Sequence, residues 1–191
     1  MLITKKIPAI KKSNVILKKY FLLLFCFISL ISCVSVKPTS SKSAKNLYET
    51  FFTGEEGTQY FIKPLKFESN SSDLLYLDIT FKHKKIIKDS GTLNFSVLNN
   101  NAFNDIDSLI ITNGETPKTI KDINFLFSEK TNKEYKSRFS GKLPLEQVKS
   151  LFINPNWKLT LYKKENKTEF IASKKSKKSI GKLYSDIFNI F

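Results

Sequence analysis

The sequence predicts a mainly β body, either an antiparallel β-sandwich or a small barrel of about eight strands, accompanied by two helices. Three observations predict this class. Apolar and polar residues alternate over several segments, turn-forming residues separate those segments, and no repeated strand–helix–strand units occur. Apolar residues at helical spacing are confined to the vicinity of residues 144–152 and to the C-terminus.

Two neighbouring segments show the clearest alternation. An apolar residue at every second position places those side chains on one buried face of a strand. The apolar positions are Leu75, Leu77, Ile79 and Phe81 in the first segment and Leu93, Phe95 and Val97 in the second. We expect residues 83–91 between them to form a hairpin connection in which Gly91 eases the turn.

The remaining strands carry weaker versions of the same pattern. Residues 123–127 alternate through Ile123, Phe125 and Phe127, and residues 157–161 through Trp157, Leu159 and Leu161. Further strands are predicted at residues 59–67, 106–112, 135–141 and 168–172. Asparagine-containing turns at residues 99–101, 113–114 and 154–155 separate them.

Two segments are predicted to be helical. In residues 144–152, Pro144 suits a helix start, and apolar residues share one face at Leu145, Val148, Leu151 and Phe152. The C-terminal segment is amphipathic through Ile180, Leu183, Tyr184, Ile187, Phe188 and Phe191. Gly181 weakens this helix by up to about 1 kcal/mol relative to alanine. We expect the C-terminal helix to close one open side of the sheet.

The first 32 residues have the composition of an export signal. Six lysines and no acidic residue accompany an apolar run at residues 20–31. As a helix this run is about 18 Å long, which is short for a bilayer core about 30 Å thick. Ser32 then places a small residue immediately before Cys33.

The basic leader, the short apolar core and the tetrad Leu30-Ile31-Ser32-Cys33 resemble the signal peptide and lipobox of bacterial lipoprotein precursors. The resemblance covers residues 1–33, and no family is recognised for the body. It implies cleavage between Ser32 and Cys33, attachment of lipid, with acyl groups such as palmitate, at Cys33, and a place in the bacterial cell envelope. Val34, in place of an aspartate, implies the outer membrane under the sorting rule of enterobacterial lipoproteins.

Two other interpretations of the leader stay open. One is an uncleaved N-terminal anchor extending to Val36, and the other is ordinary cleavage after Ser35, which releases a soluble protein. The lipobox interpretation divides the chain into a signal peptide at residues 1–32, a lipidated flexible tether at residues 33–46 and a single β-rich domain at residues 47–191. Serine, lysine and proline dominate the tether.

Charge and cysteine content limit what the body can do. The leader holds six of the 32 basic residues and none of the 17 acidic ones, so the body carries a net charge of +9. Arg138 is the only arginine, which argues against a nucleic-acid partner because base and phosphate recognition favours the planar guanidinium. Beyond Cys33 the chain has no thiol, so we expect neither a disulfide nor a cysteine-bound metal.

No catalytic residue, metal site or cofactor is predicted. His83 is the only histidine, and the adjacent lysines disfavour the imidazolium that a nucleophilic triad forms. Asp105 and Asp107 offer oxygen ligands for calcium but lack the spacing of a calcium loop, so a polar loop is expected. Glu55 and Glu56, which lie between two glycines, are expected in a solvated turn.

One basic cluster is a candidate membrane-surface contact. Lys174, Lys175, Lys177 and Lys178 lead into the C-terminal amphipathic helix, and lysines beside an apolar stripe suit a helix lying on anionic lipid. The competing interpretation, in which the helix packs on its own domain and the lysines are solvated, is favoured because a small domain needs that apolar area.

These observations lead to a functional hypothesis. The chain is expected to be a non-enzymatic envelope lipoprotein, held to the membrane through the lipid on Cys33, that serves as an accessory or interaction module for an envelope protein partner. The alternative is a carrier whose barrel-like interior binds a lipid or a small apolar ligand. An envelope hydrolase is the least favoured hypothesis.

Overall fold

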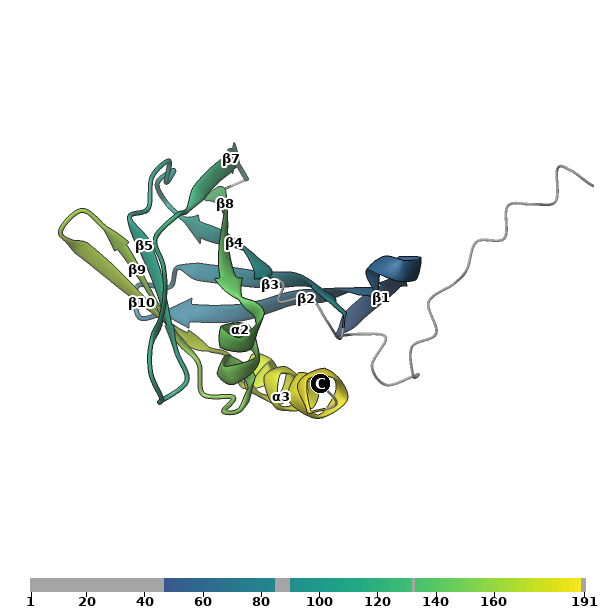
Figure 1. Ribbon diagram of the computed structural model, residues 1–191. Helices are drawn as coiled ribbons and strands as arrows, with labels where there is room; N and C mark the ends of the chain where they lie inside the picture. The colour runs from purple at the N-terminus through teal and green to yellow at the C-terminus, as the bar shows by residue number, and fades with distance from the viewer. Residues whose placement is uncertain (1–46, 85–89, 132, 190–191) are drawn as a thin grey trace, which may run out of the picture. The chain divides into compact units, whose positions relative to one another are not determined.

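The computed structural model describes residues 47–84, 90–131 and 133–189 (Figure 1). The predicted signal peptide, Ser32, Cys33 and the tether lie outside the described residues, as does Phe191. The predicted mainly β, antiparallel class is confirmed, because every paired strand is antiparallel to its neighbours in one sheet that curls into a half-barrel. Within the described residues no helix is long and apolar enough to cross a membrane.

The described elements comprise ten strands, two α-helices and two short helical turns. The strands are β1 (Tyr48–Phe52), β2 (Thr58–Ser69), β3 (Leu74–His83), β4 (Ser90–Asn99), β5 (Ser108–Thr112), β6 (Lys118–Ile120), β7 (Asn124–Lys130), β8 (Tyr135–Pro144), β9 (Lys158–Lys163) and β10 (Asn166–Ala172). The helices are α2 (Leu145–Phe152) and α3 (Lys174–Leu183), with a 3₁₀ turn, η1 (Gly54–Glu56), and a π-helical turn, η2 (Tyr184–Phe188).

The connection between the two edge strands explains the curl of the sheet. The strand order is β6-β5-β9-β10-β2-β3-β4-β8-β7, with β1 pairing to β2, so β6 and β7 stand at opposite ends of the path. Only residues 121–123 join them, so the two ends of the sheet must approach each other. They meet where Gly141 of β8 faces Ile120 of β6, so closely that a Cβ on Gly141 would lie 2.5 Å from the Ile120 Cγ2.

The core fills the concave side of the sheet and the space under the helices. The apolar residues predicted on β3, β4 and β9 are all buried there. Both α-helices pack at one end of the sheet, α2 against β8 and β4, and α3 against β2 and β10 (Figure 1). Their contribution to the core is Val148, Leu151, Phe152, Ile180 and Leu183, joined by Ile187 and Phe188 of η2.

Both predicted helices are confirmed, and α3 begins earlier than its apolar pattern indicates. Ser173 caps it by accepting a hydrogen bond from the Ser176 N–H at 3.2 Å. The Ser176 hydroxyl in turn accepts the backbone N–H of Lys66 on β2 at 2.8 Å. The lysine-rich first turn is therefore helical because it is fastened to the sheet, and the helix does close one side of the sheet as predicted.

Two local expectations differ from the structure, and two short strands lie outside the predicted ones. Gly91 lies inside β4 rather than in a turn, and it is needed because Val148 of α2 approaches to 2.9 Å from the position a Cβ would take. Phe125 and Phe127 do not share a buried face, because a bulge at Leu126 places them on opposite faces of the exposed strand β7. The short strands β1 and β6 were not predicted, because neither shows an alternating pattern.

The contact between Gly141 and Ile120 can be tested by a double-mutant cycle. Gly141→Ala is expected to lower the free energy of unfolding by about 1–3 kcal/mol, since the new methyl group must displace packed side chains. Adding Ile120→Ala should cost less in the Gly141→Ala background than in the wild type, because it removes the clash. Urea unfolding followed by Trp157 fluorescence measures both effects.

Gly181→Ala is the matched control for this cycle. No atom lies within 4 Å of the position its Cβ would occupy, and Gly181 stands within α3. The substitution is expected to stabilise the protein by up to about 1 kcal/mol. Additive effects of Gly141→Ala and Ile120→Ala would contradict the closure of the sheet at this point.

Candidate functional site

The four lysines of the predicted membrane contact lie on the first turns of α3. Lys174, Lys175 and Lys178 are exposed and Lys177 is partly exposed, while the apolar residues of the same helix are buried against the domain. The packing interpretation of the helix is therefore the one observed. In the described part of this segment no exposed apolar stripe adjoins the lysines, so an electrostatic contact is the means by which they could meet a membrane.

The polar residues singled out in the sequence do not come together. Asp105 forms an ion pair with Lys163 at 2.8 Å, and this hydrogen bond, followed by further lysine charge, lowers the pKa of the Asp105 carboxyl. Asp107 accepts the backbone N–H of Lys164, and Glu55 stands exposed in η1. Among the described residues no group of three His, Cys, Asp or Glu side chains is placed to hold a metal ion.

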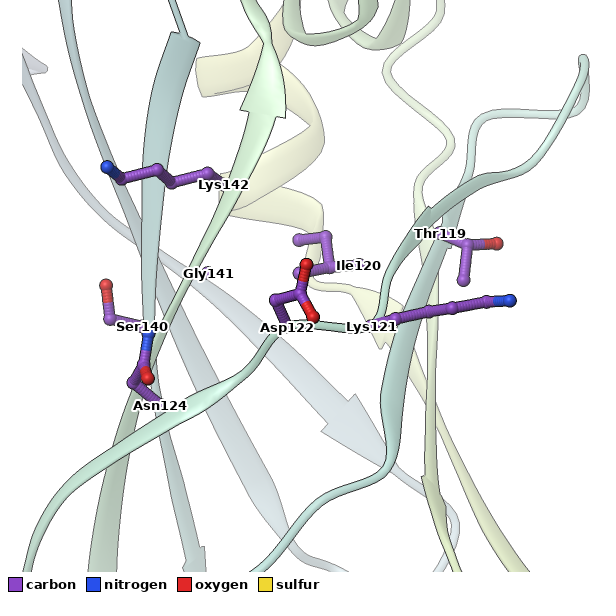
Figure 2. A pocket seen from close by; sticks show the side chains of 8 residues that line it. All are labelled: Thr119, Ile120, Lys121, Asp122, Asn124, Ser140, Gly141 and Lys142. Carbon is purple, nitrogen blue, oxygen red and sulfur yellow. The ribbon is translucent and has the colours of Figure 1, made fainter.

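Two hollows are lined entirely by described residues, and polar side chains contribute to the lining of both. The first, of about 460 Å³, lies where β6 meets β8 and is lined largely by polar side chains. Lys121 and Lys142 extend away from each other there, so their ammonium groups do not converge on one ligand (Figure 2). The second, of about 500 Å³, lies beside Phe103 and Ile106 in the β4–β5 connection, with asparagines and lysines around it.

The single arginine organises a polar network on the convex face of the sheet. Arg138 of β8 reaches across β4 and donates two hydrogen bonds of 2.9 Å to the carboxylate of Asp78 on β3. It also donates to the Ser96 hydroxyl at 3.0 Å, and Asn94 donates to Asp78 at 3.3 Å. Nη2 makes both bonds to Asp78 while Nη1 makes the bond to Ser96. The single nitrogen of a lysine does not reproduce two diverging donor groups, which gives a structural reason for an arginine in a lysine-rich chain.

Exposed aromatic side chains gather at one end of the sheet. β1, the facing residues 58–62 of β2 and the turn η1 between them form what we call the aromatic arm (Figure 1). Phe51 and Phe61 meet edge to face on its convex side, with ring centroids 5.6 Å apart. Phe52 lies on the opposite side of the strand and is 78% exposed, the highest value among the exposed large apolar residues of the described chain.

The inner side of the arm is anchored on the core. Tyr60 stacks on Phe81 with ring centroids 5.0 Å apart, and Tyr48 lies 6.3 Å from Tyr60. Burial is the main cause that raises the pKa of both tyrosine hydroxyls, with a smaller effect of Asp186 on Tyr48 and of Tyr48 on Tyr60. Gly57 closes the turn at a φ of 97° directly against the His83 carbonyl, a position with no room for a side chain.

Strand β7 is a second exposed apolar feature. All seven of its residues are exposed, including Phe125, Leu126 and Phe127, and it pairs only with β8 among the described strands. The bulge in β7 and Lys130 at its end both disfavour the pairing of this edge strand with a strand of another molecule.

Comparisons with protein-family models, with curated proteins and with solved structures found no significant match for this chain. Its function is therefore inferred from its own residues.

The sequence interpretation missed the aromatic arm. One signal for it exists in the chain: Phe51 and Phe52 are adjacent, so one of them must face away from the core in any strand, and the Thr-Gly-Glu-Glu-Gly turn follows at once. That signal does not predict that the arm is exposed, because its exposure depends on which strands and helices of the folded domain cover β1.

Replacing Arg138 by lysine tests the network on the convex face. We expect Arg138→Lys to lower the free energy of unfolding by about 1–2 kcal/mol, because the single nitrogen of lysine does not occupy the positions of both Nη1, which binds Ser96, and Nη2, which binds Asp78. Lys136→Gln, which removes a more exposed pair with Glu129, is the control and should change stability by less than about 0.5 kcal/mol. Equal effects of the two substitutions would show that the guanidinium bridge between Asp78 and Ser96 is unimportant.

His83 is expected to make the free energy of unfolding depend on pH, and the sign of this dependence follows from the surroundings of its side chain. Burial, and then the charge of Lys149, lower its pKa below the ordinary 6.5, so the unfolded chain binds the proton more readily. The stability contributed by neutral His83 is therefore fully present above about pH 6.5, the ordinary value, and is lost as the pH falls from there through the lowered pKa of the folded state. His83→Asn should flatten the dependence of the unfolding free energy between pH 7.5 and pH 5, and an unchanged slope would contradict it.

Proposed function

We propose that this chain is a non-enzymatic lipoprotein of the bacterial cell envelope, anchored through a lipid on Cys33 and serving as an accessory or interaction module. The observation that carries the proposal is the lysine-rich leader ending in Leu30-Ile31-Ser32-Cys33. Val34 after the cysteine supports the outer membrane as its location.

Two properties of the body support this proposal. Trp157 and the phenylalanines Phe67, Phe95 and Phe139 are all fully buried in its interior, which suits an interaction module with a filled core better than a carrier with a ligand cavity. Most of the exposed large apolar residues in the described part of the chain lie on the aromatic arm and on β7, where they are available for contacts with other molecules.

Cysteine substitutions in the full-length precursor test the anchor. Cys33→Ala is expected to abolish incorporation of a palmitate analogue during growth and to move the protein out of the detergent-soluble membrane fraction, because the only modified thiol is gone. Cys26→Ala is the matched control: it removes the other cysteine, within the leader, and should leave labelling and fractionation unchanged. A Cys33→Ala protein that still carries the label would overturn the lipobox assignment.

The interaction role is tested by cross-linking in intact cells. A lipoprotein module that binds an envelope protein should give a discrete cross-linked species with the wild-type chain. The species should weaken when Cys33→Ala removes the protein from the membrane. Failure to detect any species over a range of cross-linker lengths would count against the interaction role.

A further inference from the structure

We propose that the aromatic arm inserts its phenylalanine rings into the lipid–water interface of the membrane that holds Cys33. The inference rests on the proposed lipid attachment and adds to it a second contact, which would orient the domain on the bilayer. It replaces the lysines of α3 as the membrane-facing surface, because the apolar side of that helix is buried.

The distribution of the exposed rings favours lipid as the occupant. Phe51 and Phe61 project from the convex side of the arm, and Phe52 from the other side near the turn. A flat protein partner would cover only one side of a strand. The lipid–water interface of a membrane would surround both sides of the arm if its end were inserted. Aromatic side chains are enriched at this depth of a bilayer.

The position of the arm along the chain adds a second argument. Thirteen residues, 34–46, separate Cys33 from Leu47, and a chain of that length spans at most about 45 Å. The arm begins at Tyr48, so it is the first structural element after the lipid attachment point. Tethering raises the effective concentration of lipid at the arm, so a weak apolar contact is sufficient to orient the domain.

The charges of the arm predict the character of this contact. Glu49 is paired with Lys63 at 3.2 Å, and Glu55 is exposed in the turn beside Phe52, so the arm offers no surplus of cations for anionic lipid. A carboxylate at the turn also limits insertion to the interface, where it keeps its hydration. The contact should therefore be insensitive to salt and to anionic lipid, unlike one made by Lys174–Lys178.

Tryptophan fluorescence on a tethered protein tests the proposal. Residues 33–191 contain every strand and helix described here and all of the buried core, and Cys33 is their only thiol. This form is coupled through Cys33 to a maleimide lipid in phosphatidylcholine vesicles, with and without phosphatidylglycerol. Chemical coupling makes the result independent of lipidation in cells, so failure of the arm and failure of the proposed anchor are distinguishable.

Phe52→Trp is the reporting variant and Ile171→Trp is its matched control. Ile171 is 51% exposed on β10, and the native Trp157 is fully buried and gives a constant background. We expect the emission of Phe52→Trp to shift to shorter wavelength on vesicles and to be quenched by brominated lipid, equally in both vesicle types and at high salt. The emission of Ile171→Trp should not change.

Several results would overturn the proposal. An unchanged emission of Phe52→Trp on vesicles, or equal shifts of both variants, would show that the arm has no specific contact with lipid. A shift that needs phosphatidylglycerol and disappears with salt would show an electrostatic contact instead. A concentration-dependent shift without vesicles would indicate that two copies pair through the arm.

A binding measurement on the uncoupled protein gives an independent test. With Cys33→Ser in residues 33–191, Phe51→Ser/Phe52→Ser should reduce partition into phosphatidylcholine vesicles by about tenfold or more, given the apolar area lost. Ile153→Ser/Ile171→Ser removes two side chains of comparable exposure elsewhere and should leave partition unchanged. Equal losses in the two double variants would contradict a specific role of the arm.

Discussion

Side-chain hydrogen bonds at the C-terminal end of α2 link segments that come from the two ends of the strand order. The Asn113 side chain donates to the carbonyls of Ser150 and Leu151, each at 3.0 Å, and the Trp157 indole donates to Leu151 at 2.7 Å. α2 follows β8, whereas Asn113 follows β5 and Trp157 precedes β9, on the other side of the strand order. Because this helix end is buried, these donors satisfy carbonyls that water reaches poorly.

From this point a continuous series of aromatic contacts leads to the arm. Each ring supports the next, so the arm is an extension of the core rather than an independent hairpin. The series passes from Trp157 to Phe152 (4.8 Å), Phe188 (4.3 Å), Phe81 (5.3 Å), Tyr60 (5.0 Å) and Tyr48 (6.3 Å). Such support matters for a surface contact, because an ordered arm loses less conformational entropy on binding.

Several features of the fold were predictable because they depend on local pattern. Alternation on β3, β4 and β9 and helical spacing in α2 and α3 each place apolar residues on one face, and those faces became the core. The exposure of apolar and charged side chains on the surface was harder to predict. A bulge at Leu126 changed the face of Phe127, and the burial of Ile180 and Leu183 left no exposed apolar stripe beside the α3 lysines in the described chain. Each outcome depends on contacts between segments far apart in the chain.

The sequence by itself determined the mainly β class, most of the element order and the hypothesis of a lipid on Cys33. Each of these depends on patterns within short segments of the chain, which can be recognised without knowing how distant segments pack. Only the tertiary structure decided which apolar residues stay exposed. Phe51 and Phe52 carry the same side chain as the buried phenylalanines. They stay exposed because β1 is an edge strand that pairs only with β2, and no element of the described chain covers them. Long-range pairing therefore decides which of the many phenylalanines pack the core and which are available to a partner.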